Sequence, residues 1–158
     1  MDIETDVETQ PADNADGVDY DELPTYVGYL LRRAQATIFR EFERSLGDIG
    51  LTPGAFGLLM LIRANPGITQ MDLANAFGID KSTLTPVLNR LERGGLVRRK
   101  QMAHDRRYNA LYFEESQEDF FAGARTRVRN FEQSVANRLS PQEQSELVRL
   151  IGKLQAED

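Results

Sequence analysis

Residues 69–113, TQMDLANAFGIDKSTLTPVLNRLERGGLVRRKQMAHDRRYNALYF, hold the pattern that decides the fold. Thr69 and Asp80 are N-capping residue types, and each stands before a short stretch with helical spacing of apolar residues. Gly78 lies between the two stretches, where the chain must turn sharply. Two short helices joined by a glycine turn predict a helix-turn-helix. The side chains expected to face the core are Leu73, Ala74, Phe77, Leu84, Val87, Leu88 and Leu91.

The rest of this stretch predicts a β-hairpin. Residues 96–100 and 108–113 have the composition of strands, and the polar residues 102–107 separate them. From Lys81 to Arg107 there are eight basic and only two acidic residues. A hairpin with a basic tip directly after a helix-turn-helix predicts a wing. The local positive charge predicts a surface that faces nucleic-acid phosphates.

A long amphipathic helix is predicted before this core. Apolar residues recur every three or four positions from Val27 to Leu46, and the pattern ends near Gly47. Thr52 and Pro53 then supply a capping hydroxyl and a first-turn proline for a short buried helix.

Two more helices are predicted after the hairpin. Apolar residues recur at helical spacing from Phe120 to Leu139, and residues 140–143 (SPQE) form a capping box that opens the last helix. The flanking helices carry more apolar surface than the small core can cover, which predicts a homodimer. We therefore expect a mostly α-helical fold with a small β-hairpin wing. Its parts are a disordered acidic tail (1–22), dimerisation helices (23–50 and 114–158) and a winged helix-turn-helix core (51–113) within one domain (23–158).

Composition narrows the classes of protein that the chain can belong to. Of its 158 residues none is cysteine, which excludes disulfides and thiol sensing, and the lone histidine, His104, argues against a histidine metal site. We expect no metal and no cofactor. The net charge is -6, but nine acidic residues and no basic one lie in residues 1–24, so the remainder is basic. Without an apolar run near the roughly 18 residues that span a bilayer, and without signal-peptide features at the N-terminus, a cytoplasmic protein is expected.

The second helix of the helix-turn-helix is the expected recognition helix. Asn and Arg can contact base edges, Ser and Thr can contact bases or phosphates, and proline offers an apolar surface to a thymine methyl. A merely solvated outer face is the alternative, and the basic hairpin that follows disfavours it. We expect a slight irregularity at Pro86, on the second turn of the helix. The predicted DNA-binding residues of this helix are Lys81, Ser82, Thr83, Thr85, Pro86, Asn89 and Arg90.

From about Thr52 to Phe113 the sequence resembles the winged helix-turn-helix core of the MarR family. Asp105 and Arg107 match the Asp-x-Arg motif of that family's wing. The resemblance implies that Arg107 reaches into the DNA minor groove and that Asp105 helps to hold the wing, with Arg106 as the alternate contact. A guanidinium suits a narrow A·T-rich minor groove because negative potential concentrates there.

The recognition helix is further similar to that of the OhrR branch, over residues 82–88 (STLTPVL). That branch senses organic peroxides through a cysteine. Because this chain has no cysteine, only the DNA-facing similarity carries over.

The family resemblance also implies a repressor that a small molecule releases from a near-palindromic operator. Members commonly bind small aromatic acids, phenols or related metabolites between the dimerisation helices and the winged domain. A guanidinium among aromatic rings can pair with a ligand carboxylate, although ordinary core or dimer packing is the alternative. The candidate effector residues are Tyr26, Tyr29, Arg33, Phe39 and Phe56. An arginine-rich first helix could also receive a coenzyme A thioester, or form a solvated or dimer-bridging face, through Arg32, Arg33, Arg40 and Arg44.

Three functions remain open on the sequence. A ligand-responsive regulator is favoured, a constitutive DNA-binding or architectural protein shares every DNA-facing feature, and a winged-helix protein-interaction module is the third. An enzyme is disfavoured because there is no nucleophile triad, no glycine-rich phosphate loop and no metal cluster in the pattern. The acidic tail could compete with phosphates for the basic surface, or serve only solubility.

Overall fold

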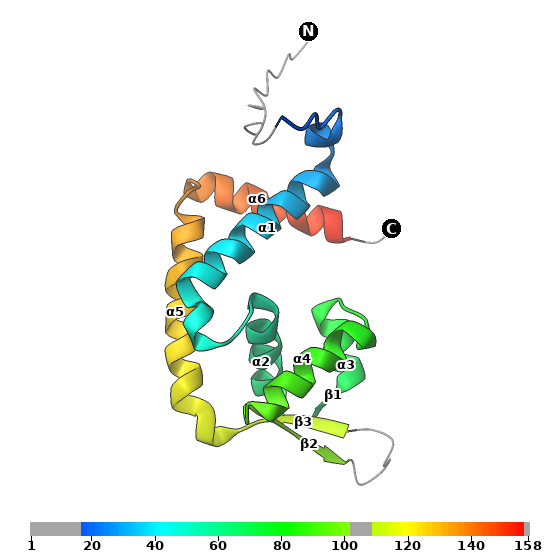
Figure 1. The fold of residues 1–158 in the computed structure, drawn as a ribbon, viewed down its shortest axis with the longest axis vertical. Coiled ribbons are helices and arrows are strands. Elements are labelled where there is room, and N and C mark those ends of the chain that lie inside the picture. The colour runs from blue at the N-terminus through cyan, green and yellow to red at the C-terminus, as the bar shows by residue number, and fades with distance from the viewer. Residues whose placement is uncertain (1–16, 102–108, 157–158) are drawn as a thin grey trace. The chain divides into compact units, whose positions relative to one another are not determined.

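The computed structural model describes residues 17–101 and 109–156. These residues divide into two units, one ending at Arg40 and the other beginning at Glu41, and each unit is described by itself. The helices are α1 (Val27–Leu46), α2 (Pro53–Ala64), α3 (Gln70–Phe77), α4 (Lys81–Arg93), α5 (Glu118–Ala136) and α6 (Pro141–Gln155) (Figure 1). The strands are β1 (Ile68–Thr69), β2 (Val97–Gln101) and β3 (Asn109–Phe113), and short 3₁₀ turns cover Leu23–Thr25, Gly47–Ile49 and Glu115–Gln117.

The helices α2, α3, α4 and α6 begin at the predicted capping residues. The hydroxyl oxygens of Thr52 and Thr69 accept hydrogen bonds from backbone N–H groups at 3.2 and 3.1 Å. The Asp80 carboxylate does the same for α4. Ser140 and Glu143 form the predicted capping box. These caps satisfy backbone donors that have no partner within the helix, and so they set where each helix starts.

A left-handed glycine makes the turn between α3 and α4. Gly78 has φ 71° and ψ 33°, a conformation that residues with a Cβ adopt at a cost. Its backbone N–H bonds to the carbonyl groups of Ala74 and Asn75, which closes α3. The predicted helix-turn-helix is confirmed.

The strands form one antiparallel sheet in the order β1-β3-β2. β2 and β3 are the predicted hairpin arms, with Val97 opposite Phe113, although β2 starts one residue later than predicted. β1 pairs Ile68 with Leu111 and was missed by sequence analysis. A strand of two residues carries no alternation of apolar and polar side chains, and only its partner strand defines it.

One hydrophobic core joins the helix-turn-helix to the sheet and to α5. Within the described chain, the largest fully buried side chains are Leu58, Leu59, Ile62, Leu73, Leu84, Leu88, Leu91, Leu111 and Phe121. Phe121 of α5 lies 5.8 Å from the ring of Phe56 and 5.3 Å from that of Phe113, measured between centroids. α5 is thereby anchored to the winged core. The fold is mostly helical with a small sheet, as expected.

An aromatic contact attaches the C-terminal end of α1 to α5, and an ion pair attaches the 3₁₀ turn after α1 to the same helix. Phe42 meets Phe131 edge to face at 5.5 Å. Arg127 bonds both carboxylate oxygens of Asp48, at 2.7 and 2.8 Å. These groups tie the start of the second unit to the helix that follows the hairpin.

The first unit includes residues that the sequence assigned to the acidic tail. The rings of Tyr20 and Tyr29 lie 6.5 Å apart, and the guanidinium of Arg33 lies 5.9 and 5.8 Å from their centroids. Tyr26 donates a hydrogen bond from its hydroxyl to Glu22 at 2.7 Å. The described contacts therefore begin before the expected boundary at residue 22, while residues 1–16 lie outside the description.

Over residues 17–101 and 109–156 no single helix is both long and apolar enough to cross a membrane. One bent pair, Val27–Ile49 with Pro53–Ala64, meets the length and composition criteria only when the two are taken together.

Candidate nucleic-acid interface

The recognition helix α4 has one buried and one exposed face. Leu84, Leu88 and Leu91 are almost fully buried, as their 3.6-residue spacing predicted. The opposite face carries most of the predicted DNA-binding residues in exposed positions, and only Thr85 is half-buried. The exposed ones are Lys81, Ser82, Thr83, Pro86, Asn89 and Arg90.

The first turn of α4 is organised around the carboxylate of Asp80. It accepts hydrogen bonds from the Ser82 hydroxyl at 2.5 Å, the Thr83 backbone N–H at 2.8 Å and the Thr83 hydroxyl at 3.0 Å. Together these bonds hold the pKa of Asp80 at about 2, below its usual 3.8, so the group is ionised at neutral pH. Because both hydroxyl hydrogens point to Asp80, Ser82 and Thr83 present only acceptor lone pairs to a ligand in this arrangement.

Thr85 links the two helices of the motif. Its hydroxyl donates to the carbonyl oxygen of Lys81 and accepts a bond from the side-chain amide of Gln70 on α3, both at 2.8 Å. Thr85 was predicted as a DNA contact, and the structure gives its hydroxyl this bridging role between α3 and α4. Gln70 was not among the predicted site residues. Its place at the first position of α3, directly after the cap, is the only signal in the sequence.

The far end of α4 is tied to the hairpin by Arg99 of β2. Its guanidinium donates to the side-chain oxygen of Asn89 at 2.9 Å and to a carboxylate oxygen of Glu92 at 2.6 Å. In the sequence Arg99 stands out only as one of the basic residues between Lys81 and Arg107. Its spacing of seven residues from Glu92 gives no hint of the contact, because the chain reverses between them at residues 94–95.

The neighbouring Arg98 has other partners. Alternate residues of a strand point to opposite faces of the sheet. The Arg98 guanidinium lies 4.7 Å from the centroid of the Tyr112 ring and 3.5 Å from a carboxylate oxygen of Glu114. Of the two arginines, only Arg99 bonds to the recognition helix in the described structure.

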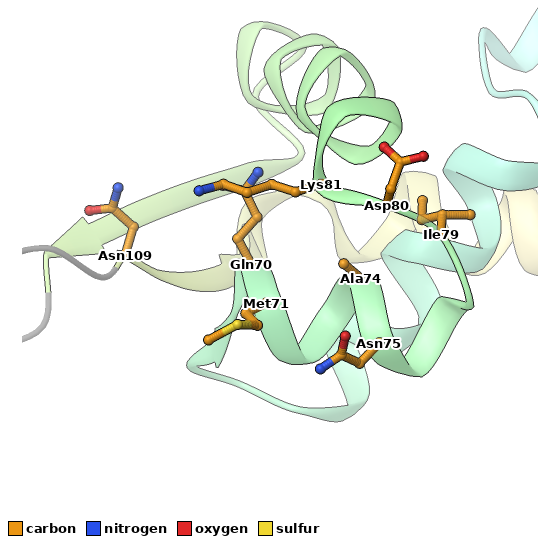
Figure 2. A pocket seen from close by; sticks show the side chains of 8 residues that line it. All are labelled: Gln70, Met71, Ala74, Asn75, Ile79, Asp80, Lys81 and Asn109. Atoms are coloured by element: carbon orange, nitrogen blue, oxygen red, sulfur yellow. The ribbon is translucent and has the colours of Figure 1, made fainter.

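A hollow of about 530 Å³ lies beside the start of the recognition helix. Figure 2 shows Lys81 extending from α4 toward the side of the hollow where Asn109 begins β3, while Gln70 reaches from α3 toward α4. Its lining is completed by Met71, Ala74, Asn75, Ile79 and Asp80. An ammonium group and side-chain amides placed between a recognition helix and the base of a wing suit contacts with a nucleic-acid backbone.

The predicted wing-tip residues Asp105, Arg106 and Arg107 lie outside the described residues, as does His104. The roles assigned to them stay predictions. The hairpin arms are described as far as Gln101 on β2 and from Asn109 on β3.

The candidate effector residues fall into both units. Tyr29 and Arg33 lie together in the first unit, where Tyr20, which sequence analysis did not select, joins them. Tyr26 bonds to Glu22, and Phe39 is exposed. Phe56 belongs to the second unit, where it stacks on Phe121 at the edge of the core, in line with the packing alternative.

In the described part of the chain no group of three or more His, Asp or Glu residues is placed to hold a metal ion. The features that stand out are an exposed polar helix face, a two-armed hairpin beside it and a left-handed glycine turn. This combination defines the class of winged helix-turn-helix proteins.

Comparisons with known proteins agree with this class. The family model described as MarR family matches residues 49–107. A proposed transcriptional regulatory protein for the hcr operon of Thauera aromatica is 35% identical over 133 residues, which cover 84% of this chain and 80% of that protein. The repressor CouR bound to a 23-mer DNA duplex is similar in structure, with a TM-score of 0.79, 28% identity, and coverage of 88% of this chain and 99% of that one. CouR bound to p-coumaroyl-CoA gives a TM-score of 0.79 at 27% identity, with coverage of 89% and 99%.

The chain belongs to the MarR family of winged helix-turn-helix transcriptional regulators. It is a DNA-binding transcriptional regulator and not an enzyme, as the sequence predicted.

Proposed function

We propose that this regulator is a homodimeric repressor that binds a near-palindromic operator and is released by a small aromatic acid, a phenol or a coenzyme A thioester of such an acid. The observation that carries the proposal is the exposed polar face of α4. The leucines on the opposite face of this helix are buried in the core, and the hairpin lies beside the helix. In this arrangement α4 lies in the major groove and the wing lies over the adjacent minor groove.

The charge on this surface supports DNA binding. Arg90 and Arg93 lie exposed in the last turns of α4, and Lys81 begins the helix beside the hollow. Lys81 and Asn109 would contact the backbone that runs between the two grooves, while Asn89, Arg90 and Pro86 face base edges. Arg107 would enter the minor groove, with Asp105 holding the wing and Arg106 as the alternate contact.

Exposed apolar side chains on the outer helices support a homodimer. Val148 and Leu154 of α6 are 72% and 60% exposed, which is unfavourable for a helix that faces only water. Further exposed apolar residues are Leu147, Leu150 and Ile151 of α6 and Val27, Leu30, Leu31 and Phe39 of α1. A second copy that covers these faces would form a two-fold dimer and place two recognition helices about 34 Å apart.

The aromatic cluster of the first unit supports an aromatic effector. Arg33 lies against Tyr20 and Tyr29. The ring of an aromatic acid could stack on the tyrosines while its carboxylate accepts two hydrogen bonds from the Arg33 guanidinium. Tyr26 and Phe39 of the same unit are the further candidates. The structural relative CouR, which binds p-coumaroyl-CoA, makes aromatic acids and their thioesters the compounds to test first.

The test is a fluorescence anisotropy titration of the full-length chain on DNA from upstream of its own coding region, at two salt concentrations. A panel of aromatic acids, phenols and their coenzyme A thioesters is then added. Tight, salt-sensitive binding that one compound releases supports the proposal. Tight binding that no compound changes would instead favour a constitutive DNA-binding protein.

A matched pair of variants locates the effector site. Arg33→Gln should retain operator binding and lose most of the response to the compound, because the carboxylate partner is gone. Arg129→Gln makes the same change of charge at an exposed position of α5 and should respond like the wild type. Equal responses from both variants would remove Arg33 from the proposed site.

A further inference from the structure

The Asn89 side chain of the recognition helix is held in one orientation. The guanidinium of Arg99 donates to its side-chain oxygen at 2.9 Å. A guanidinium has only donors, so the group that faces it must be the carbonyl oxygen of the amide and not the NH₂ group. Asn89 is otherwise exposed, and its NH₂ group is left to face a ligand.

Arg99 is itself fixed by a second partner. Its guanidinium donates at 2.6 Å to Glu92, which lies one helical turn beyond Asn89 on α4. The Arg99 side chain is only 23% exposed, so part of it is sheltered between β2 and α4. The planar guanidinium of Arg99 bonds both Asn89 and Glu92. The Asn89 amide can therefore rotate only if its bond to Arg99 is broken.

We propose that Arg99 is a positioning residue that makes Asn89 a donor-only contact, so that Asn89 selects guanine or thymine and rejects adenine. An asparagine contacts adenine by donating to N7 and accepting from N6, which requires both the NH₂ group and the carbonyl oxygen to point toward the base. Guanine offers the acceptors N7 and O6, and thymine offers O4. Because Arg99 holds the oxygen toward β2, Asn89 turns its NH₂ group toward the DNA. This group matches the acceptors of guanine and thymine, whereas the N6 amino group of adenine would face another donor.

This inference rests on the proposed function, because it requires α4 to contact base edges. It adds the class of base that one side chain selects. It also gives the hairpin a part in base selection through β2, separate from any contact that the wing tip makes.

The experiment is selection of bound sequences from random DNA by the full-length chain, followed by sequencing. Asn89→Ala identifies the base position that depends on Asn89, because the preference at that position alone should disappear. The wild type should bind guanine or thymine there about tenfold better than adenine, the lower range expected for one good base contact. Arg99→Met keeps the aliphatic stem and removes the donors, so discrimination against adenine should fall to threefold or less.

Lys100→Met is the matched control, since it removes one positive charge from the next residue of β2. It should weaken binding to all sequences in a salt-dependent way and leave every base preference unchanged. In the Asn89→Ala background, Arg99→Met should change no base preference further. That result distinguishes positioning of Asn89 from a general effect on the fold.

Three results would overturn the inference while operator binding stands. They are selection of adenine by the wild type at the Asn89-dependent position, unchanged discrimination in Arg99→Met, and no position that depends on Asn89. Failure of the wild type to select any sequence would be a different result, because it would overturn the proposed operator binding and the inference with it.

Discussion

At the scale of single residues, hydrogen bonds within the protein determine what the recognition helix can offer to DNA. Asp80 takes the hydroxyl hydrogens of Ser82 and Thr83, and Arg99 takes the carbonyl oxygen of Asn89. The hydroxyls of Ser82 and Thr83 therefore present acceptors, and Asn89 presents donors. Judged by residue type alone, each of these side chains can both donate and accept hydrogen bonds.

Removing the carboxylate of Asp80 should lower stability in a pH-dependent way. Asp80→Ala should lower the melting temperature at pH 7, because α4 loses its N-cap and two hydroxyl groups lose their acceptor. The folded-state pKa is about 2 against an ordinary 3.8, so the stabilisation is fully present above 3.8 and is lost as the pH falls through about 2.

The check is a series of thermal melts between pH 7 and pH 3. The difference in melting temperature between wild type and Asp80→Ala should narrow toward the acid end. Asp80→Asn keeps a capping side chain that does not titrate, so it should lie closer to the wild type at pH 7. A difference that stays constant over this range would contradict the role given to the ionised carboxylate.

At the scale of elements, most of the fold could be predicted from the sequence. Local rules locate helix ends, because caps such as Thr52 and Ser140 act within one turn. β1 could not be predicted, since its two residues become a strand only by pairing with β3. The Arg99 contact with α4 was missed for the same kind of reason, because it depends on how β2 packs beside the helix.

The helices α2 and α3 approach closely at Gly57. A Cβ atom at this position would lie 2.7 Å from the ring of Phe77, whereas one at Gly54 in the same helix would meet nothing within 4 Å. Alanine favours a helix interior over glycine by about 1 kcal/mol, but overpacking typically costs about 1–3 kcal/mol. Gly57→Ala should therefore lower the free energy of unfolding by about 1 kcal/mol.

Denaturant unfolding of the two glycine variants checks this contact. Gly54→Ala is the matched control and should be as stable as the wild type or slightly more stable. If Gly57→Ala also proved as stable as the wild type, the ring of Phe77 would have to move without a cost in stability. The close packing of α2 on α3 would then not require glycine at residue 57.

At the scale of the whole molecule, the proposed assembly depends on faces that the single chain leaves exposed. The apolar spacing of α6 predicted the helix and its stripe, but a sequence does not say whether a stripe meets its own chain or another. In the structure Leu147 and Leu154 are 44% and 60% exposed, although both have the spacing of packed residues. The aromatic effector set was only partly predictable, since Tyr20 joins Arg33 and Phe56 packs on Phe121.

Placing a charge in this face should weaken the dimer. Val148→Asp buries an unpaired carboxylate if a second copy covers α6, so we expect a shift toward monomer and a loss of tight operator binding. Gln142→Asp adds the same charge in the first turn of α6 and should leave the assembly unchanged. Analytical ultracentrifugation at several concentrations measures both, and an unchanged dimer in Val148→Asp would exclude this face from the interface.

In the proposed complex, two recognition helices of a symmetric dimer occupy successive major grooves of one operator. Hydroxyl-radical footprinting of the full-length chain on its selected DNA tests this most directly. We expect two equivalent protected regions related by a two-fold axis, with their centres about one helical turn, or 34 Å, apart. A single protected region, or two regions without symmetry, would contradict it.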